Sequence, residues 1–241
     1  MKVPYIHTEE IHNMVAPREV VPIVIDLVKP QSVADVGCGM GTWLKAFAEA
    51  GVNEYVGVDG EFVDPLMLHI PAERFVAKDL RENWSLGKKF DLVVSLEVAE
   101  HLPEAKADLF VEVLVNHAKN NILFSAAVPG QGGQNHLNEQ WPEYWQKKFE
   151  KYGFYFHDVI RPLIWNNQKI HWWYRQNIFL VTREKADTRI LNCIHPACLI
   201  EHTQQFNKIN SKLMAGEFGV ALSLKILFKS LKIFVKSKIR F

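Results

Sequence analysis

The sequence predicts an α/β fold with a doubly wound, mostly parallel sheet, and three observations support this. A β-branched run at residues 33–36 leads into a glycine-rich turn and then a helical pattern. Strand-like and helix-like segments alternate as far as residue 126, as right-handed crossovers between parallel strands require. Acidic residues recur where successive strands end, which is the edge at which such sheets bind ligands.

The glycine turn places Gly37, Gly39 and Gly41 between the first strand and a helix pattern that includes Leu44 and Phe47. Glycine supplies backbone angles that are closed to other residues, and it lets a ligand lie directly on the main chain. Many α/β proteins also use glycine simply to leave a strand. The residues that follow the turn therefore decide whether it binds a ligand.

Three later strand-like runs end next to Asp59, Asp79 and Glu97. A carboxylate at the tip of the second strand can accept hydrogen bonds from both hydroxyls of a ribose. Single acidic residues after strands are usually turn formers or helix caps. Their repetition behind a glycine turn favours a nucleoside-containing ligand instead. The runs are residues 55–58, 74–77 and 90–96.

Together these residues resemble the class I S-adenosylmethionine-dependent methyltransferases over about the first 180 residues. The resemblance implies a Rossmann-like, seven-stranded sheet that ends in an antiparallel hairpin, with S-adenosyl-L-methionine as the cofactor. It also implies that Asp35 and the glycine loop hold the methionine part and that Asp59 holds the ribose. Asp79 and Leu80 would border the adenine, and residues 90–103 would pass beneath the methyl group. The implied cofactor residues are Asp35, Gly37, Gly39, Gly41, Asp59, Gly60, Asp79, Leu80, Leu96 and Glu97.

A nicotinamide-dinucleotide site competes with this interpretation, because it too uses glycines followed by an acid roughly 20 residues later. The spacing here is Gly-x-Gly-x-Gly, and only one set of strand–helix units precedes a C-terminal part of different character. Both features favour the methyltransferase.

A polar, glycine-rich loop over residues 128–141 follows the fifth strand and is expected to form the acceptor site. His136 is its candidate catalytic base, because imidazole titrates near neutral pH, and Glu139 would orient it. A merely connecting loop could have a similar composition. His101 is the alternative catalytic residue, and it either faces the methyl group or braces the helix after Pro103.

The segment GQGGQNHLNEQWPEYW is similar, more loosely, to bacterial methyltransferases associated with surface-polysaccharide synthesis. The expected reaction is therefore O-methylation of a saccharide or glycan precursor. Three alternatives stay open: a nitrogen acceptor or small metabolite, a metal-assisted O-methyltransferase, and a non-catalytic module that binds the cofactor. Metal assistance needs clustered ligands. Glu97 and Glu139 alone are too few, so no metal site is predicted.

The methyltransferase domain is predicted to cover residues 1–184, and residues 185–241 form a helical extension. Two strand-like runs, residues 154–165 and 172–182, are expected to pair as the antiparallel hairpin. The aromatic residues Trp172–Tyr174 suit either stacking on a sugar or packing in the core.

The last part of the chain, residues 218–241, forms a basic amphipathic pattern. Apolar residues such as Leu224 and Phe228 recur on one helical face, with lysines on another. The tail contains six cationic residues and no acidic one, so the rest of the chain, within a total of +1, has a net charge of −5. A mildly acidic body argues against a broad nucleic-acid surface. Contact with a membrane and packing on the body or a partner subunit both stay open. The cationic residues are Lys225, Lys229, Lys232, Lys236, Lys238 and Arg240.

The composition, 48% hydrophobic and 23% charged, fits an ordinary globular chain of 241 residues. Three scattered cysteines are too few for a disulfide framework. The first residues lack the apolar core of a signal peptide, and no run reaches 18 apolar residues. The expected location is therefore the cytoplasm, with peripheral membrane contact left open. The predicted partners are a saccharide or other small-molecule acceptor and no nucleic acid, with a homo-oligomer left open.

Overall fold

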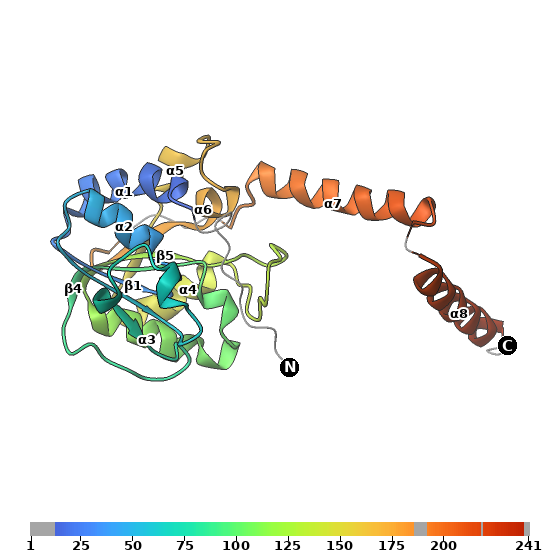
Figure 1. Ribbon diagram of the computed structural model, residues 1–241, viewed down its shortest axis with the longest axis horizontal. Coiled ribbons are helices and arrows are strands. Elements are labelled where there is room, and N and C mark those ends of the chain that lie inside the picture. Colours follow the sequence, from blue (N-terminus) through green and yellow to red (C-terminus); the bar gives the residue numbers. More distant parts are fainter. Residues whose placement is uncertain (1–12, 186–191, 218, 239–241) are drawn as a thin grey trace. The chain divides into compact units, whose positions relative to one another are not determined.

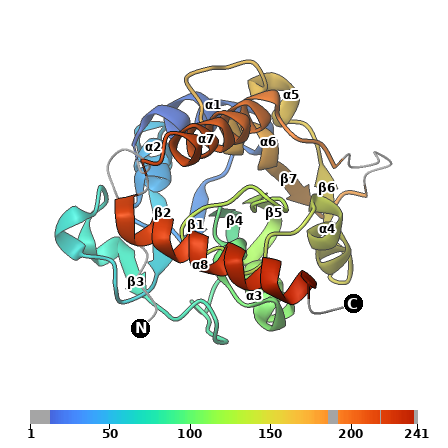
Figure 2. The ribbon, with the colours of Figure 1, turned by 90° about the vertical axis from the view of Figure 1, so that its right-hand side faces the viewer.

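A seven-stranded sheet forms the centre of the first unit, with the strand order β3-β2-β1-β4-β5-β7-β6 that Figure 2 shows from left to right. Strands β1 to β5 pair in parallel, whereas β7 pairs antiparallel with both β5 and β6. The computed structural model describes residues 13–185, 192–217 and 219–238, and the chain divides into two compact units, residues 1–195 and 196–241. The strands are β1 (Ser32–Val36), β2 (Glu54–Asp59), β3 (Phe75–Ala77), β4 (Phe90–Leu96), β5 (Ala118–Ser125), β6 (Tyr155–His157) and β7 (Phe179–Thr182).

Helices cover both faces of this sheet, as Figure 1 shows. Four helices pack on one face: α1 (Val15–Val28), α2 (Thr42–Glu49), α5 (Arg161–Ile164) and α6 (Trp172–Asn177). Two helices pack on the other: α3 (Ala107–His117) and α4 (Pro142–Glu150). Short 3₁₀ turns occupy the connections at Pro65–Met67, Ala72–Arg74, Ala99–His101 and Glu104–Lys106.

The central strands are buried on both faces, which explains their nearly continuous apolar sequence. In β1, Ala34 and Val36 belong to the core beneath α3 and α4, while Val33 belongs to the core beneath α1 and α2. In β4, Val93 and Val94 divide between the two cores in the same way. Period-two alternation thus fills two separate cores, and the predicted doubly wound fold is confirmed.

The antiparallel strands are shorter than the sequence predicts. The run expected over residues 154–165 is a strand only in β6 and then becomes α5, and the run expected over 172–182 begins as α6 before it becomes β7. Aromatic residues favour strands by propensity, but Tyr174 is buried with its ring edge-on to that of Trp43, at a centroid separation of 5.3 Å. Packing on α2 therefore outweighs the strand propensity.

The aromatic segment at α6 is divided between the core, which contains Tyr174, and the half-buried Trp172 and Trp173. Tyr174 and Arg175 are buried, and the Arg175 guanidinium donates to the carbonyl of Trp165 at 3.1 Å. The Trp173 ring stacks on that of His171 at 4.2 Å between centroids. Core packing, one of the two interpretations left open, accounts for Tyr174 and Arg175.

The second unit consists of α7 (Pro196–Met214) and α8 (Gly219–Lys238). It begins at Pro196, whereas the sequence places the domain boundary after residue 184; the intervening residues 186–191 lie outside the described part of the chain. None of the helices that the structure describes is long and apolar enough to cross a membrane.

Candidate active site

The glycine turn leaves β1 at the carboxyl edge of the sheet and is fixed against its neighbours. The backbone N–H groups of Gly37 and Cys38 both donate to the carbonyl of Val58, at 2.7 and 3.2 Å. Gly37 has a φ of +86°, and a Cβ there would lie 2.3 Å from Val98, in the loop after β4. Any side chain at position 37 is excluded both by this φ and by Val98. The turn is therefore held between the second and fourth strands.

Asp59, the last residue of β2, ties that strand to the turn. Its Oδ2 accepts from the backbone N–H of Gly39 at 2.7 Å, and its Oδ1 accepts from that of Gly60 at 2.6 Å. Burial raises the pKa of Asp59, and the two N–H groups oppose this rise. Each carboxylate oxygen keeps a second lone pair, so the side chain can still accept from ribose hydroxyls.

Asp35 lies in β1 directly before the turn and is 2% exposed. Among the described residues, its Oδ2 has no hydrogen-bond partner. Burial, and then the nearby charge of Asp59, raise the pKa of Asp35 well above its usual range. A buried carboxyl oxygen that lacks a donor beside a glycine turn fits a cationic or N–H-bearing ligand group, such as the ammonium of a methionine moiety.

Glu97 follows β4 and connects it with two other segments. It adopts a φ of +55°, which is uncommon for a residue with a side chain. Its carboxylate accepts from the Gln131 side chain at 2.8 Å and from the Asn177 side chain at 3.1 Å. Burial raises the pKa of Glu97, and these amide donors oppose the rise. Glu97 thus joins the acceptor loop and the end of α6 to the end of β4.

The acceptor loop over residues 128–141 is organised around Glu139. Its Oε1 accepts from Gly132 N–H and from His136 Nδ1, and its Oε2 accepts from Gly130 N–H, each at 2.8 Å. Although burial favours the neutral acid, these hydrogen bonds lower the pKa of Glu139, so it is the acceptor and Nδ1–H of His136 is the donor. The predicted contact between His136 and Glu139 is present.

His136 lies next to His101, the other catalytic candidate. The two ring centroids are 4.9 Å apart, with the rings edge-to-face. The backbone carbonyl of Glu100 accepts from the N–H groups of Leu137 and Asn138, at 2.7 and 3.0 Å. These bonds fix the acceptor loop to the turn that contains His101. The structure therefore brings together both histidines that the sequence offered as alternatives.

Comparison with known proteins identifies the family. A family model described as "Methyltransferase domain" matches residues 12–159, which is more than half of the chain. The chain belongs to this methyltransferase family. The sequence-based resemblance to class I methyltransferases is confirmed.

A curated relative of this methyltransferase is the magnesium-protoporphyrin O-methyltransferase of Synechocystis sp. (strain ATCC 27184 / PCC 6803 / Kazusa). It is 28% identical over 103 residues, which are 39% of this chain and 44% of the relative. The matched part thus spans less than half of the curated relative's length.

Two solved structures share the fold. Magnesium protoporphyrin IX methyltransferase (ChlM) from Synechocystis PCC 6803, with bound S-adenosylmethionine, is 20% identical with a TM-score of 0.51, covering 76% of this chain and 86% of that one. CalS10, an amino pentose methyltransferase from Micromonospora echinaspora that is also bound to S-adenosylmethionine, is 16% identical with a TM-score of 0.54, covering 76% and 100%. The cofactor in both agrees with the predicted one.

The residues predicted to border the adenine are arranged differently from Asp59, which is predicted to hold the ribose. Asp79 is exposed and pairs bidentately with Arg81, whose Nη2 lies 2.6 Å from Oδ2 and whose Nε lies 2.8 Å from Oδ1. Arg81 lowers the pKa of Asp79 to about 2. Leu80 packs against the core, and Leu96 is buried at the end of β4. An adenine contact through Asp79 would have to share this carboxylate with Arg81, and it stays a prediction.

Sequence reasoning did not include three residues that the structure places at the candidate site. Asn177 and Gln131, whose side chains are 2.8 Å apart, hold Glu97, but they are far apart in the chain and nothing local marks them. Glu100 is fully buried, and burial and then the charge of Glu97 raise its pKa well above the usual range. Its position three residues after Glu97 and directly before His101 was the available signal.

Proposed function

We propose that this methyltransferase transfers a methyl group from S-adenosylmethionine to a hydroxyl oxygen of a saccharide or glycan precursor for surface-polysaccharide synthesis. The observation that supports it is the His136–Glu139 pair, on a polar loop at the edge of the sheet where the glycine turn lies. A base at this edge is what an alkyl transfer to a hydroxyl needs, because the oxygen must lose its proton.

The cofactor would be held by groups that are already in place. Asp59 would accept from the ribose hydroxyls, and Asp35 with the glycine turn would hold the methionine part. S-adenosylmethionine supplies an electrophilic methyl group, so the protein has to align the acceptor, exclude water and accept one proton.

His136 would accept that proton. Because Nδ1–H donates to Glu139, Nε2 is the nitrogen whose lone pair is left for a hydroxyl. The Glu139 carboxylate would stabilise the imidazolium that forms, and the N–H groups of Gly130 and Gly132 keep that carboxylate in position. The His136 side chain is 12% exposed, which leaves it accessible but mostly shielded from water.

A saccharide suits the loop because two exposed amide residues, Gln134 and Asn135, directly precede His136. Amides both donate to and accept from sugar hydroxyls. The structural relative CalS10 is described as an amino pentose methyltransferase, so this fold accommodates a sugar acceptor in that protein. A small metabolite or a nitrogen acceptor would use the same cofactor residues and would differ only at this loop.

Purified protein incubated with S-adenosylmethionine labelled in its methyl group tests the proposal. Nucleotide sugars, glycan precursors and small amines are offered in parallel, and His136→Ala is the control for transfer at this site. Label is expected in a sugar fraction, in a bond that is stable to mild base as a methyl ether is. Transfer to amines alone would support the nitrogen acceptor. Tight cofactor binding without transfer to any acceptor would support the non-catalytic module.

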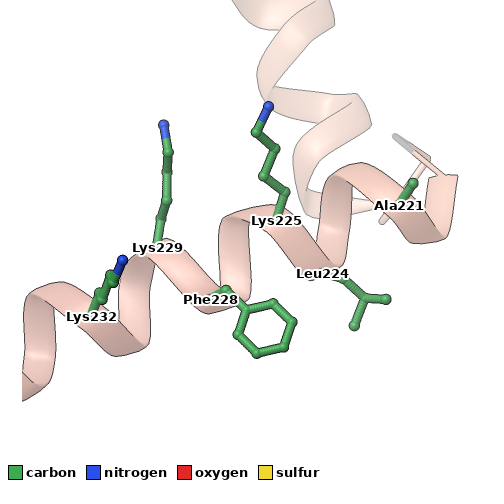
Figure 3. A pocket seen from close by; sticks show the side chains of 6 residues that line it. All are labelled: Ala221, Leu224, Lys225, Phe228, Lys229 and Lys232. Atoms are coloured by element: carbon green, nitrogen blue, oxygen red, sulfur yellow. The ribbon is translucent and has the colours of Figure 1, made fainter.

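We also propose that α8 lies on an anionic membrane surface and brings the enzyme to a membrane-delivered acceptor. Figure 3 shows Leu224 and Phe228 pointing to one side of the helix, with Lys225 and Lys229 pointing to the other. Phe228 is 67% exposed, and the other large apolar residues of α8 are also exposed. A helix with exposed apolar groups and lysines can bury the former in the headgroup region and pair the latter with lipid phosphates.

Vesicle co-sedimentation tests this second proposal. Near an anionic surface each lysine contributes about 1 kcal/mol, so replacing Lys225, Lys229 and Lys232 together with Gln should weaken binding by up to about a hundredfold. The full chain should bind anionic vesicles in a salt-sensitive way, and a chain that ends at Glu217 should not. If neither sediments, and the truncation instead dissociates an oligomer or lowers the melting temperature, α8 packs on protein.

A further inference from the structure

We infer that Glu100, His101 and His136 form a binding site for one divalent transition-metal ion of the Zn²⁺ type. The sequence analysis predicted no metal site, because it counted only Glu97 and Glu139 as carboxylates near the transferred group. The fold brings a different set together: one carboxylate and two imidazoles from two segments of the chain.

The spacing of these groups fits one shared ion. One ligand atom from each residue lies within 4.8 Å of the other two. Zinc binds imidazole nitrogen and carboxylate oxygen at about 2.0 to 2.2 Å, so two ligand atoms on one ion are at most about 4.4 Å apart. Only small side-chain rotations are therefore needed to close the site around an ion.

Glu100 provides independent support for a cation at this position. Its side chain is 0% exposed, and among the described residues no side chain donates a hydrogen bond to either carboxylate oxygen; the backbone N–H groups of Glu100 and Ala127 are the nearest donors. A buried carboxylate without a side-chain partner is costly, and a cation is the partner that compensates most for the lost hydration. The carboxylates of Glu97 and Glu139 are near enough to interact electrostatically with Glu100, which makes the pocket more favourable still for a positive ion.

The surrounding contacts hold the two imidazoles in place. The Glu139 carboxylate accepts from Nδ1–H of His136, the arrangement by which carboxylates commonly orient metal-binding histidines, and it leaves Nε2 as the ligand. The carbonyl of Glu100 accepts from Leu137 N–H, so the backbone links the two segments that supply the ligands. Gly133 makes room for the His136 ring, because a Cβ there would lie 2.3 Å from Nε2.

Two histidines and one glutamate leave coordination positions open, as in catalytic zinc sites. The ligand class for an open position is an oxygen donor, such as a hydroxyl or a pair of neighbouring hydroxyls. In the metal-bound protein the Nε2 lone pair of His136 would be taken up by the ion, so the ion, which lowers the pKa of a bound hydroxyl, would replace His136 as the group that promotes loss of the proton, and the proton would pass to solvent. This role in acceptor binding rests on the proposed function, whereas ion binding itself does not.

Metal binding is tested on the full chain after removal of metal with a chelator and then of the chelator by dialysis. Calorimetric titration with Zn²⁺ and metal analysis should both give about one ion per chain. Titration with Co²⁺ should produce visible absorption bands that report the coordination geometry of the bound ion, and these bands should be lost in His101→Gln. Glu100→Gln and His101→Gln should each weaken Zn²⁺ binding by at least about tenfold. His157→Gln, at a histidine of β6 that bonds the carbonyl of Glu184, is the matched control and should bind as the wild type does.

Thermal unfolding shows whether a variant that fails to bind Zn²⁺ is folded. Glu100→Gln retains the side-chain size and replaces a buried acid with a neutral amide, so it should fold, and Zn²⁺ should raise the melting temperature of the wild type but not of this variant. The inference is overturned if the wild type binds no ion, or if Glu100→Gln binds Zn²⁺ as tightly as the wild type. Methyl transfer that persists in chelator would leave the proposed function standing without the metal. Stoichiometric Zn²⁺ binding with no methyl transfer to any acceptor would support the metal site and contradict the proposed function.

Discussion

Replacing His136 with alanine is expected to lower the turnover of methyl transfer by about a hundredfold or more, while the affinity for S-adenosylmethionine stays within about twofold. Loss of a catalytic group that accepts a proton, or that helps to remove it, typically lowers the turnover by this factor. The residues proposed to hold the ribose and the methionine part lie on β1, β2 and the glycine turn, and the carboxylate of Asp59 accepts from Gly39 and Gly60 rather than from the imidazole, which donates to Glu139. Turnover is measured with labelled cofactor, and affinity by calorimetry.

The control for this variant is His157→Gln, which removes a histidine of β6 whose Nε2 bonds the Thr182 hydroxyl and the Glu184 carbonyl. It should keep wild-type turnover. Near-normal turnover in His136→Ala would move the chemistry to His101, the other candidate. A matching loss of cofactor affinity would mean instead that the acceptor loop supports the cofactor pocket.

Replacing Asp59 with alanine is expected to weaken the binding of S-adenosylmethionine by more than tenfold. Two hydrogen bonds from ribose to a charged acceptor are worth roughly 1.5 to 3 kcal/mol each, and about 1.4 kcal/mol corresponds to a factor of ten. The N–H groups of Gly39 and Gly60 would also lose their acceptor, so the melting temperature should fall as well. Calorimetric titration measures the affinity, and thermal unfolding measures the stability.

Asp26→Ala, at an exposed acid on α1, is the matched control for Asp59→Ala and should leave both quantities unchanged. An affinity for cofactor within twofold of the wild type would show that the ribose does not contact the end of β2. In that case the carboxylate of Asp59 would serve only to hold the glycine turn.

The parallel half of the fold was predictable because its signals are local. Strands β1 and β4 are buried on both faces, so they read as short apolar runs, and each ends at a glycine or an acid. The antiparallel half was predicted less well. The segment at Trp172–Tyr174 has strand-forming residues, and only its packing on α2 makes it helical, which no local pattern expresses.

The candidate site was likewise predictable only where its contacts are local in the sequence. His136 and Glu139 are three residues apart, so their contact could be inferred from spacing alone. Glu100 follows a strand end, where an acid usually means a turn or a cap, and its burial depends on the acceptor loop that covers it. Asn177 reaches Glu97 across 80 residues of chain, and only the sheet order brings them together.

The amide contacts of Glu97 determine which part of the chain has to be replaced together when the preference for an acceptor is altered. Its carboxylate is shared between Gln131 on the acceptor loop and Asn177 before β7. Replacing only the acceptor loop with that of a relative would remove Gln131, one of the two amide donors to the Glu97 carboxylate. It would also remove the side-chain oxygen to which Asn177 donates. The loop and the residues that lead into β7 thus form one structural module, and productive chimeras of this enzyme should exchange both together.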